Sequence, residues 1–172
     1  GILMDLSHNS EETAFDICRL SGKRPVLYSH ANPAALVAHG RNISDDIMRA
    51  VAATGGLIAL NGVGRFVGGE NLLSMLPLIE YVAGLVGIEH TAIGLDYCYD
   101  DGRPDIPADV DRGYWWPVEA GYLPGKGLSG KYISPEGLMS IGEELAKRNY
   151  TEAQIDAIMR GNILRLISQV WK

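Results

Sequence analysis

Short apolar runs alternate with amphipathic stretches along the first hundred residues. Each apolar run predicts a buried β-strand, and the runs cover residues 2–6, 26–30, 57–61 and 90–96. Helical periodicity follows the first three runs, and it covers residues 11–21, 45–54 and 70–86. Strands that are buried on both faces need not alternate between apolar and polar positions. This order therefore predicts an α/β fold with a parallel sheet covered by helices.

Capping residues indicate where the predicted helices begin. Ser10 and Ser44 each precede two acidic residues, a combination that is typical of a helix N-terminus. Pro77 lies inside the third helical stretch, so a kink or a later helix start is expected there.

Residues 97–133 interrupt this rhythm with four prolines and six glycines. So long a connection is typical of a functional loop or a lid. Residues 134–172 are expected to form terminal helices, with a capping box at Thr151 and a break near Gly161. Together these segments predict a single unit over residues 1–172, which starts inside an apolar run as a segment of something longer would.

The composition is that of a globular chain with a modest acidic excess. Hydrophobic residues make up 47% of its 172 positions, and 15 Lys and Arg against 21 Asp and Glu give a net charge of −6. This charge gives no general attraction to nucleic acid or to an anionic membrane. No apolar run reaches the roughly 18–20 residues that cross a bilayer. Neither partner is therefore expected, and a cytoplasmic location is predicted, with the periplasm as the alternative.

The two cysteines, Cys18 and Cys98, lie far apart and form no CxxC pattern. This spacing is more typical of reduced thiols than of a disulfide framework or a zinc ribbon. A single bridge between them is left open.

Polar residues close all four apolar runs, namely His8, His30, Asn61 and Asp96. In parallel α/β sheets, catalytic and binding groups lie at the carboxyl ends of the strands, because the loops converge there. His8 and His30 are 22 positions apart, which is one strand-helix-strand step. Their imidazoles are therefore expected at the same rim, where they could share one divalent ion, with zinc as the default metal.

Each candidate also has an ordinary structural explanation. A histidine that ends a strand is most often a hydrogen-bonding residue, and Asp96 could cap the segment that follows. Arg41 is explained either as a solvated arginine or as a clamp for a substrate carboxylate. Trp115 and Trp116 are explained either as a hydrophobic plug over the rim or as part of a lid.

Five motifs occur in a fixed order along the chain. They are Asp5-Leu-Ser-His8, Arg24-Pro-Val-Leu-Tyr-Ser-His30, Gly40-Arg-Asn42, Gly94-Leu-Asp96 and Asn149-Tyr-Thr-Glu152. In this order the chain resembles the renal (membrane) dipeptidase family of zinc peptidases. The first motif, together with the Ser-His pair at its spacing, is the specific part. The segment around Trp116 is similar to the bacterial branch of the family.

This resemblance implies a (β/α)8 barrel with a two-zinc site that hydrolyses dipeptides, some of them with a D-residue at the C-terminal position. By position, His8 and His30 match two histidines that ligate one zinc. Arg41 matches the arginine that contacts the substrate carboxylate. Asp96 matches the acid that transfers a proton.

The resemblance covers only the last four βα units of such a barrel and its terminal helices, a half-barrel. A complete barrel takes about 250 residues, and this sequence lacks the family's His-x-Asp pair. The missing ligands imply a partner, either an N-terminal half or a second copy of the chain in a homo-oligomer. Alone, the chain is expected to show little activity and at most weak, mononuclear zinc binding.

Two other interpretations stay open. In the first, the half-barrel is a non-catalytic module that pairs with itself or with another chain. In the second, the barrel acts on another amide or a lactam, since neither Trp115 nor Trp116 indicates the shape of the pocket.

Overall fold

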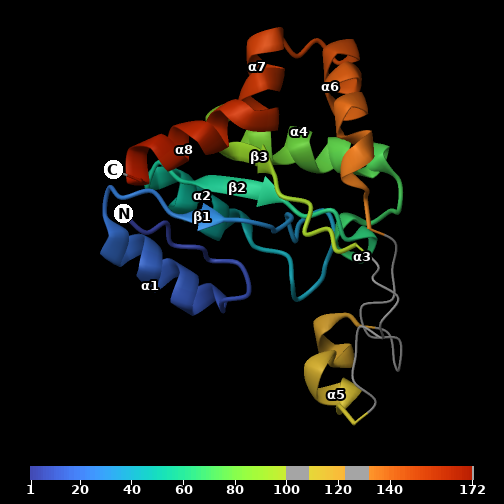
Figure 1. The fold of residues 1–172 in the computed structure, drawn as a ribbon. Helices are drawn as coiled ribbons and strands as arrows, with labels where there is room; N and C mark the ends of the chain where they lie inside the picture. Colours follow the sequence, from blue (N-terminus) through green and yellow to red (C-terminus); the bar gives the residue numbers. More distant parts are fainter. Residues whose placement is uncertain (100–108, 123–131, 172) are drawn as a thin grey trace.

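Three parallel strands form the sheet of this protein, whose computed structural model describes residues 1–99, 109–122 and 132–171 (Figure 1). The strands pair in the order β1 (Leu27–Tyr28), β2 (Leu57–Leu60) and β3 (Thr91–Ile93). Two helices connect them, α2 (Asp45–Ala53) after β1 and α4 (Met75–Val86) after β2, and α1 (Glu11–Ser21) precedes β1. The predicted α/β fold with a parallel sheet is confirmed.

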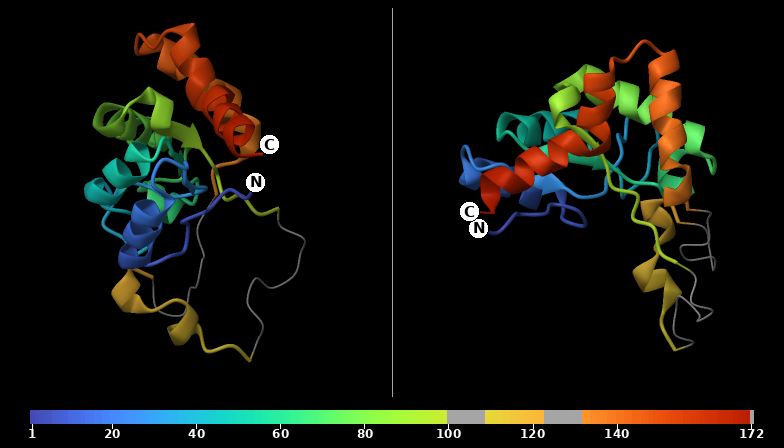
Figure 2. Two further views of the ribbon diagram at one scale, coloured as in Figure 1. Left: turned by 90° about the vertical axis from the view of Figure 1, so that its left-hand side faces the viewer. Right: turned by 45° about the horizontal axis from the view of Figure 1, so that its top comes forward.

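Shorter elements complete the described part of the chain. They are α3 (Gly64–Val67), η1 (Leu72–Ser74), η2 (Ile88–His90), α5 (Arg112–Trp115), η3 (Val118–Ala120), η4 (Pro135–Gly137), α6 (Leu138–Lys147), α7 (Glu152–Asp156), the π-helical turn η5 (Ala157–Gly161) and α8 (Asn162–Val170). The N- and C-termini lie side by side, with Gly1 against Val170 (Figures 1 and 2).

The predicted helix starts are found where the capping residues place them. The Ser10 hydroxyl accepts a hydrogen bond from the Thr13 amide, and Thr151 forms the expected capping box. Pro77 is the third residue of α4, where no intrahelical amide bond is required, so the later helix start is the expectation that the structure confirms. The expected break near Gly161 is the π-helical turn η5, which continues directly into α8.

The first predicted strand, residues 2–6, is reduced to a single parallel bridge between Asp5 and Leu27. The Leu6 amide donates to the Leu27 carbonyl, but the ladder stops there. The Ser29 amide, which would make the next ladder bond, donates to the Asp5 carboxylate instead. The Leu6 carbonyl accepts from Asn9 in a turn. Side-chain and turn hydrogen bonds thus replace the strand that the apolar pattern predicts.

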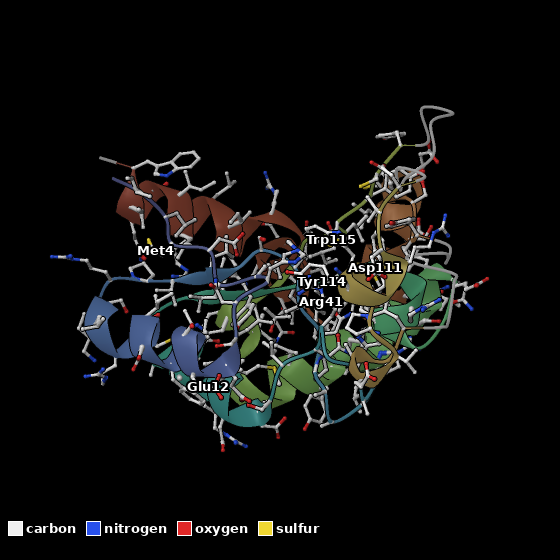
Figure 3. All side chains as sticks on the ribbon, turned by 90° about the horizontal axis from the view of Figure 1, so that it is seen from below. Met4, Glu12, Arg41, Asp111, Tyr114 and Trp115 are labelled. Atoms are coloured by element: carbon white, nitrogen blue, oxygen red, sulfur yellow. The ribbon has the colours of Figure 1, made fainter. Side chains whose placement is uncertain are left out.

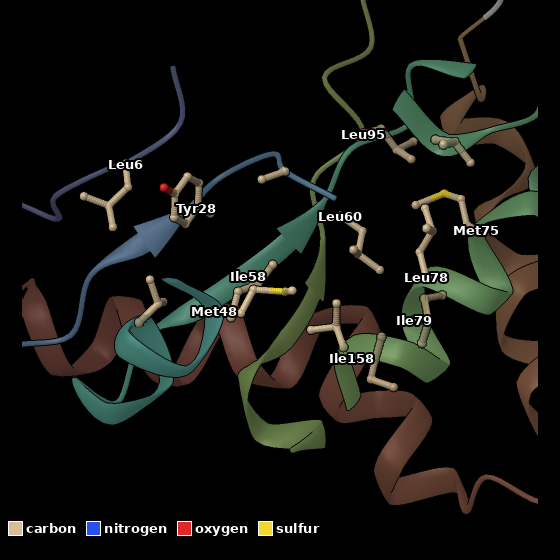
Figure 4. Close-up of a cluster of buried hydrophobic side chains, with 14 of the residues drawn as sticks. Leu6, Tyr28, Met48, Ile58, Leu60, Met75, Leu78, Ile79, Leu95 and Ile158 are labelled. Carbon is tan, nitrogen blue, oxygen red and sulfur yellow. The ribbon is translucent and has the colours of Figure 1, made fainter. Parts of the chain in front are cut away.

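The two faces of the sheet contact different helices. Tyr28 and Ile58 are register partners and pack into the main core with residues of α2 and α4 (Figure 4). Residues of α1 belong to the same core. Leu27 and Leu57 point to the opposite face, where Leu166 of α8 packs on them. Both residues are therefore covered, with exposed fractions of 8% for Leu27 and 0% for Leu57.

A close approach between strand ends brings the polar residues together. A Cβ atom on Gly94 would lie 1.9 Å from the Ser29 carbonyl oxygen and 3.0 Å from Ala59. Only glycine permits this contact, which carries the chain from β3 toward the end of β1. Because of this close approach, the motif Gly94-Leu-Asp96 places Asp96 near His30.

The predicted long loop, residues 97–133, lies partly outside the described residues. In its described part, Tyr114 and Trp115 of α5 are 76% and 61% exposed (Figure 3). Trp116 is half-buried against a small cluster that includes Phe66 and Tyr122. The plug interpretation therefore fits Trp116 and does not fit Trp115. No helix in the described ranges is both long and apolar enough to span a bilayer.

Candidate metal and substrate site

His8 and His30 meet at the rim, as their spacing predicts. The Nε2 atom of His8 lies 2.9 Å from the Nε2 atom of His30. His30 follows β1, and His8 follows the Asp5 bridge with a left-handed backbone, φ 70°. A non-glycine residue in this conformation is uncommon and costs backbone energy, so the surrounding contacts hold His8 in place.

Arg41 joins this pair from the loop between β1 and α2. Its guanidinium Nη2 lies 3.1 Å from Nε2 of His8, and its central carbon lies 5.8 Å from the centre of the Phe66 ring. The loop is held by the next residue, since Asn42 donates to the carbonyls of Val37 and Phe66. Arg41 is therefore a fixed, half-buried cation rather than a solvated surface arginine.

Asp96 completes the group of four candidates. One carboxylate oxygen, Oδ2, lies 3.9 Å from Nε2 of His30 and accepts a hydrogen bond from Asn61 at 3.1 Å. Asp96, like His8, has a left-handed backbone, φ 56°. Asn61 is in turn held by the buried Asn32, which accepts from the Asn61 amide nitrogen and donates to its carbonyl. The sequence did not single out Asn32, because a buried asparagine in a loop gives no periodic signal.

Behind the imidazoles, Asp5 and Ser29 form a second set of contacts. Asp5 accepts hydrogen bonds from the backbone amides of Ser7 and Ser29 and from the Ser29 hydroxyl. The Ser29 hydroxyl also lies 2.7 Å from Nδ1 of His30. The motifs contain both residues, but they do not reveal that the two side chains meet.

Local electrostatics favour a neutral His8 and a charged Asp5. Burial, together with the positive charge of Arg41 and the neighbouring imidazole of His30, lowers the pKa of the His8 imidazole. Burial alone would raise the pKa of Asp5, but hydrogen bonds from Ser29 and Ser7 outweigh it and leave the pKa below its ordinary value of 3.8. Neutral imidazole is the form that binds a metal ion.

A cavity of about 180 Å³ opens beside these residues. His8, His30 and Arg41 line one side, and Tyr28 and Ile43 contribute apolar surface. The cavity thus combines donors for an anionic group with the exposed faces of both imidazoles.

The imidazole pair fits one zinc ion in part. Two nitrogens at about 2.0–2.1 Å from a tetrahedral zinc ion would be about 3.3 Å apart, close to the 2.9 Å found between His8 and His30. Within the described ranges, however, no group of three or more His, Cys, Asp or Glu residues is arranged to hold a metal. Further ligands are therefore required to complete a centre.

The other two histidines have structural contacts. His39 packs on Phe66 and Tyr122, with ring centres 4.6 and 5.0 Å apart. His90, at the opposite end of the sheet, lies with Nδ1 2.8 Å from the Gly56 carbonyl. The contacts of both histidines are therefore structural.

Fold and rim together define an α/β protein with its polar site at the carboxyl ends of parallel strands. The sequence model described as "Membrane dipeptidase (Peptidase family M19)" matches residues 1–113. The chain belongs to this family, and the resemblance seen in its motifs is confirmed.

Solved structures share the fold over nearly the whole chain. An amidohydrolase from Pseudomonas aeruginosa is 30% identical with a TM-score of 0.73, and the match covers 99% of this chain and 53% of that one. The probable dipeptidase PvdM from the same organism is 19% identical with a TM-score of 0.72, over 96% and 49%. A Rhodobacter sphaeroides metallo peptidase, liganded with a phosphinate mimic of L-Ala-D-Ala, is 19% identical with a TM-score of 0.69, over 97% and 42%. The chain thus spans about half the length of these relatives.

Proposed function

We propose that this chain supplies part of the active site of a zinc-dependent dipeptidase, and that its sheet is half of a (β/α)8 barrel. The observation that carries the proposal is the contact between His8 and His30, whose Nε2 atoms face each other at 2.9 Å in a member of a metallopeptidase family. Arg41 lies within hydrogen-bond distance of His8, at 3.1 Å. The Asp96 carboxylate lies 3.9 Å from the His30 imidazole.

His8 and His30 would hold one zinc ion through their Nε2 atoms. When bound, zinc acts as a Lewis acid on the scissile carbonyl and on the attacking water. Arg41 provides a cation at the cavity, where a guanidinium can bind the terminal carboxylate of a dipeptide with two parallel hydrogen bonds. The roles of His8, His30 and Arg41 thus follow from the groups that they present to the cavity.

Asp96 is proposed to move the proton. Its carboxylate is 35% exposed on the side chain, so it can accept a proton from water and pass it to the leaving amine. Asn61 donates to Oδ2 and orients the carboxylate toward the imidazoles. The left-handed backbone of Asp96 also helps to direct this carboxylate toward the imidazoles.

A dipeptide substrate agrees with what the relatives bind. The Rhodobacter sphaeroides relative holds a mimic of L-Ala-D-Ala, a small peptide with one free carboxylate. The name amidohydrolase, given to another relative, describes cleavage of the same kind of bond. Both support a small amide substrate that Arg41 could anchor.

The remaining ligands are proposed to come from an N-terminal half of the barrel, with a second copy of the chain as the alternative. The relatives are about twice as long as the matched part of this chain, and two imidazoles with one aspartate do not make a two-metal centre. By itself, the 172-residue chain is proposed to bind at most one zinc weakly and to hydrolyse dipeptides little. The cytoplasmic location stays a prediction.

A non-catalytic half-barrel is the second candidate. It is favoured by one observation, that the described ranges contain no cluster of three or more metal-ligating residues. Intact mass and light scattering of the native protein distinguish the two candidates. A companion segment carrying a His-x-Asp pair supports the enzyme, whereas a homodimer of this chain that lacks zinc supports the module.

Replacing His8 in the complete protein tests the enzyme directly. We expect His8→Ala to reduce zinc content and to lower dipeptide hydrolysis by more than about 100-fold, because even groups behind a ligand are worth 10- to 100-fold. His90→Ala is the matched control, since His90 lies at the other end of the sheet. Unchanged zinc content and rate in His8→Ala would show that the assignment is wrong.

A further inference from the structure

The contacts behind His30 restrict where its proton can lie. Oδ1 of Asp5 accepts from the backbone amides of Ser7 and Ser29, both at 3.0 Å. Oδ2 of Asp5 lies 2.6 Å from the Ser29 hydroxyl. A carboxylate only accepts hydrogen bonds, so the single hydroxyl proton of Ser29 points to Asp5.

The Ser29 oxygen can therefore only accept from its other strong partner, His30 Nδ1, which lies 2.7 Å away. For this bond to form, Nδ1 of His30 must carry the proton. A neutral imidazole has one N–H, so Nε2 is then left with a free lone pair. That atom is the one that faces His8 at the rim.

We propose that Asp5 and Ser29 are positioning residues that hold His30 in the Nδ1–H tautomer and keep its Nε2 lone pair free at the rim. The link to zinc rests on the proposed function, whereas the tautomer itself does not. In metal sites the second ring nitrogen of a histidine ligand usually donates to a fixed acceptor. Here Ser29 provides that acceptor, and Asp5 orients Ser29.

The same reasoning applies to His8. The Arg41 guanidinium can only donate, and its Nη2 lies 3.1 Å from Nε2 of His8, so that nitrogen is an acceptor and carries no proton. His8 therefore has no proton on Nε2 to donate to Nε2 of His30, which lies 2.9 Å away. The lone pair on Nε2 of His30 is thus left without a donor from His8 and is available at the rim to a cation.

The Asp5→Asn substitution tests the tautomer with little change of shape. Its amide oxygen can keep the two backbone hydrogen bonds from Ser7 and Ser29. Its amide nitrogen, however, donates to the Ser29 hydroxyl, which then turns its own proton to Nδ1 of His30. We expect ¹⁵N-resolved NMR of the metal-free 172-residue chain at pH 8 to show the Nδ1–H form in the wild type and the Nε2–H form in D5N.

Two further variants keep the test valid if D5N folds poorly. Ser29→Ala removes the acceptor and should abolish the preference for Nδ1–H, while Ser29→Thr keeps a hydroxyl and should restore it. Asp46→Asn, an exposed acid paired with Arg49, is the matched control. A His30 that stays Nδ1–H in both D5N and Ser29→Ala would overturn the proposal.

Zinc titration of the same proteins separates this proposal from the proposed function. We expect D5N and Ser29→Ala to weaken zinc binding 10- to 100-fold relative to the wild type and to Asp46→Asn. If the tautomer switches but no variant, nor the wild type, binds zinc, the positioning role stands and the zinc site is wrong. If zinc binds equally well to all of them, the positioning role is wrong and the zinc site stands.

Discussion

The two ends of the sheet use similar polar residues in different ways. At the end where the strands begin, Asn162 donates to the carbonyls of Ile88 and Thr91, at 2.7 and 2.9 Å. Arg165 donates to the carbonyls of Gly55 and Glu89. Side chains of α8 thereby satisfy main-chain groups, and Leu166 of the same helix covers Leu27 and Leu57.

At the opposite end the side chains face one another instead of the main chain. His8 lies against His30 and Arg41 beside a cavity, and Asp96 lies near His30. Two of these residues, His8 and Asp96, are held in left-handed backbone conformations. Polar groups that satisfy the backbone stabilise a fold, whereas polar groups that are strained and directed at each other are available for a ligand.

Asp96→Asn should produce the largest change, a loss of catalytic activity without a loss of stability. Loss of the carboxylate removes the proposed proton transfer, so kcat of the complete enzyme should fall about 100- to 10,000-fold. Zinc content and thermal stability should stay near those of the wild type. The control is Asp16→Asn, an exposed acid on α1. A normal kcat in D96N would remove Asp96 from the mechanism.

Leu166→Ala should have the opposite pattern, with loss of stability and no loss of zinc. Leu166 is fully buried against Leu27 and Leu57, and truncation of a buried leucine costs about 2–5 kcal/mol. Leu164→Ala in the same helix is the control, because Leu164 is 53% exposed and should change stability by less than about 0.5 kcal/mol. Urea unfolding measures both. Equal urea midpoints for Leu166→Ala and Leu164→Ala would contradict the packing of α8 on the sheet.

Asn162→Ala should also destabilise the fold, by less than Leu166→Ala does. It leaves two carbonyl groups without their donor, which costs about 1–3 kcal/mol in free energy of unfolding. Gln169→Ala, at an exposed position of the same helix, should change little. Thermal unfolding of the two variants side by side provides the measurement. A weakened zinc affinity in folded N162A would contradict the separation of the two ends.

Most of the fold and the meeting of His8 and His30 could be predicted from local signals, whereas the place of Arg41 beside them could not. Ser10 and Thr151 mark helix starts because capping depends on neighbouring residues alone. His8 and His30 were placed at one rim because parallel strands end on the same side of a sheet. The bridge at Asp5 could not be predicted in this way, since a side chain from one segment competes with the backbone of another.

The α/β order, the capped helix starts and the polar residues that close the apolar runs follow from local sequence, because these features depend on short-range periodicity and capping. Which atoms meet depends on the packing of distant segments. This packing places Ser29 between Asp5 and His30, directs the Nε2 atoms of two imidazoles at each other, and lays α8 over Leu27 and Leu57. These contacts join residues distant in sequence. Their geometry depends on the packing of the whole sheet, which no local pattern encodes.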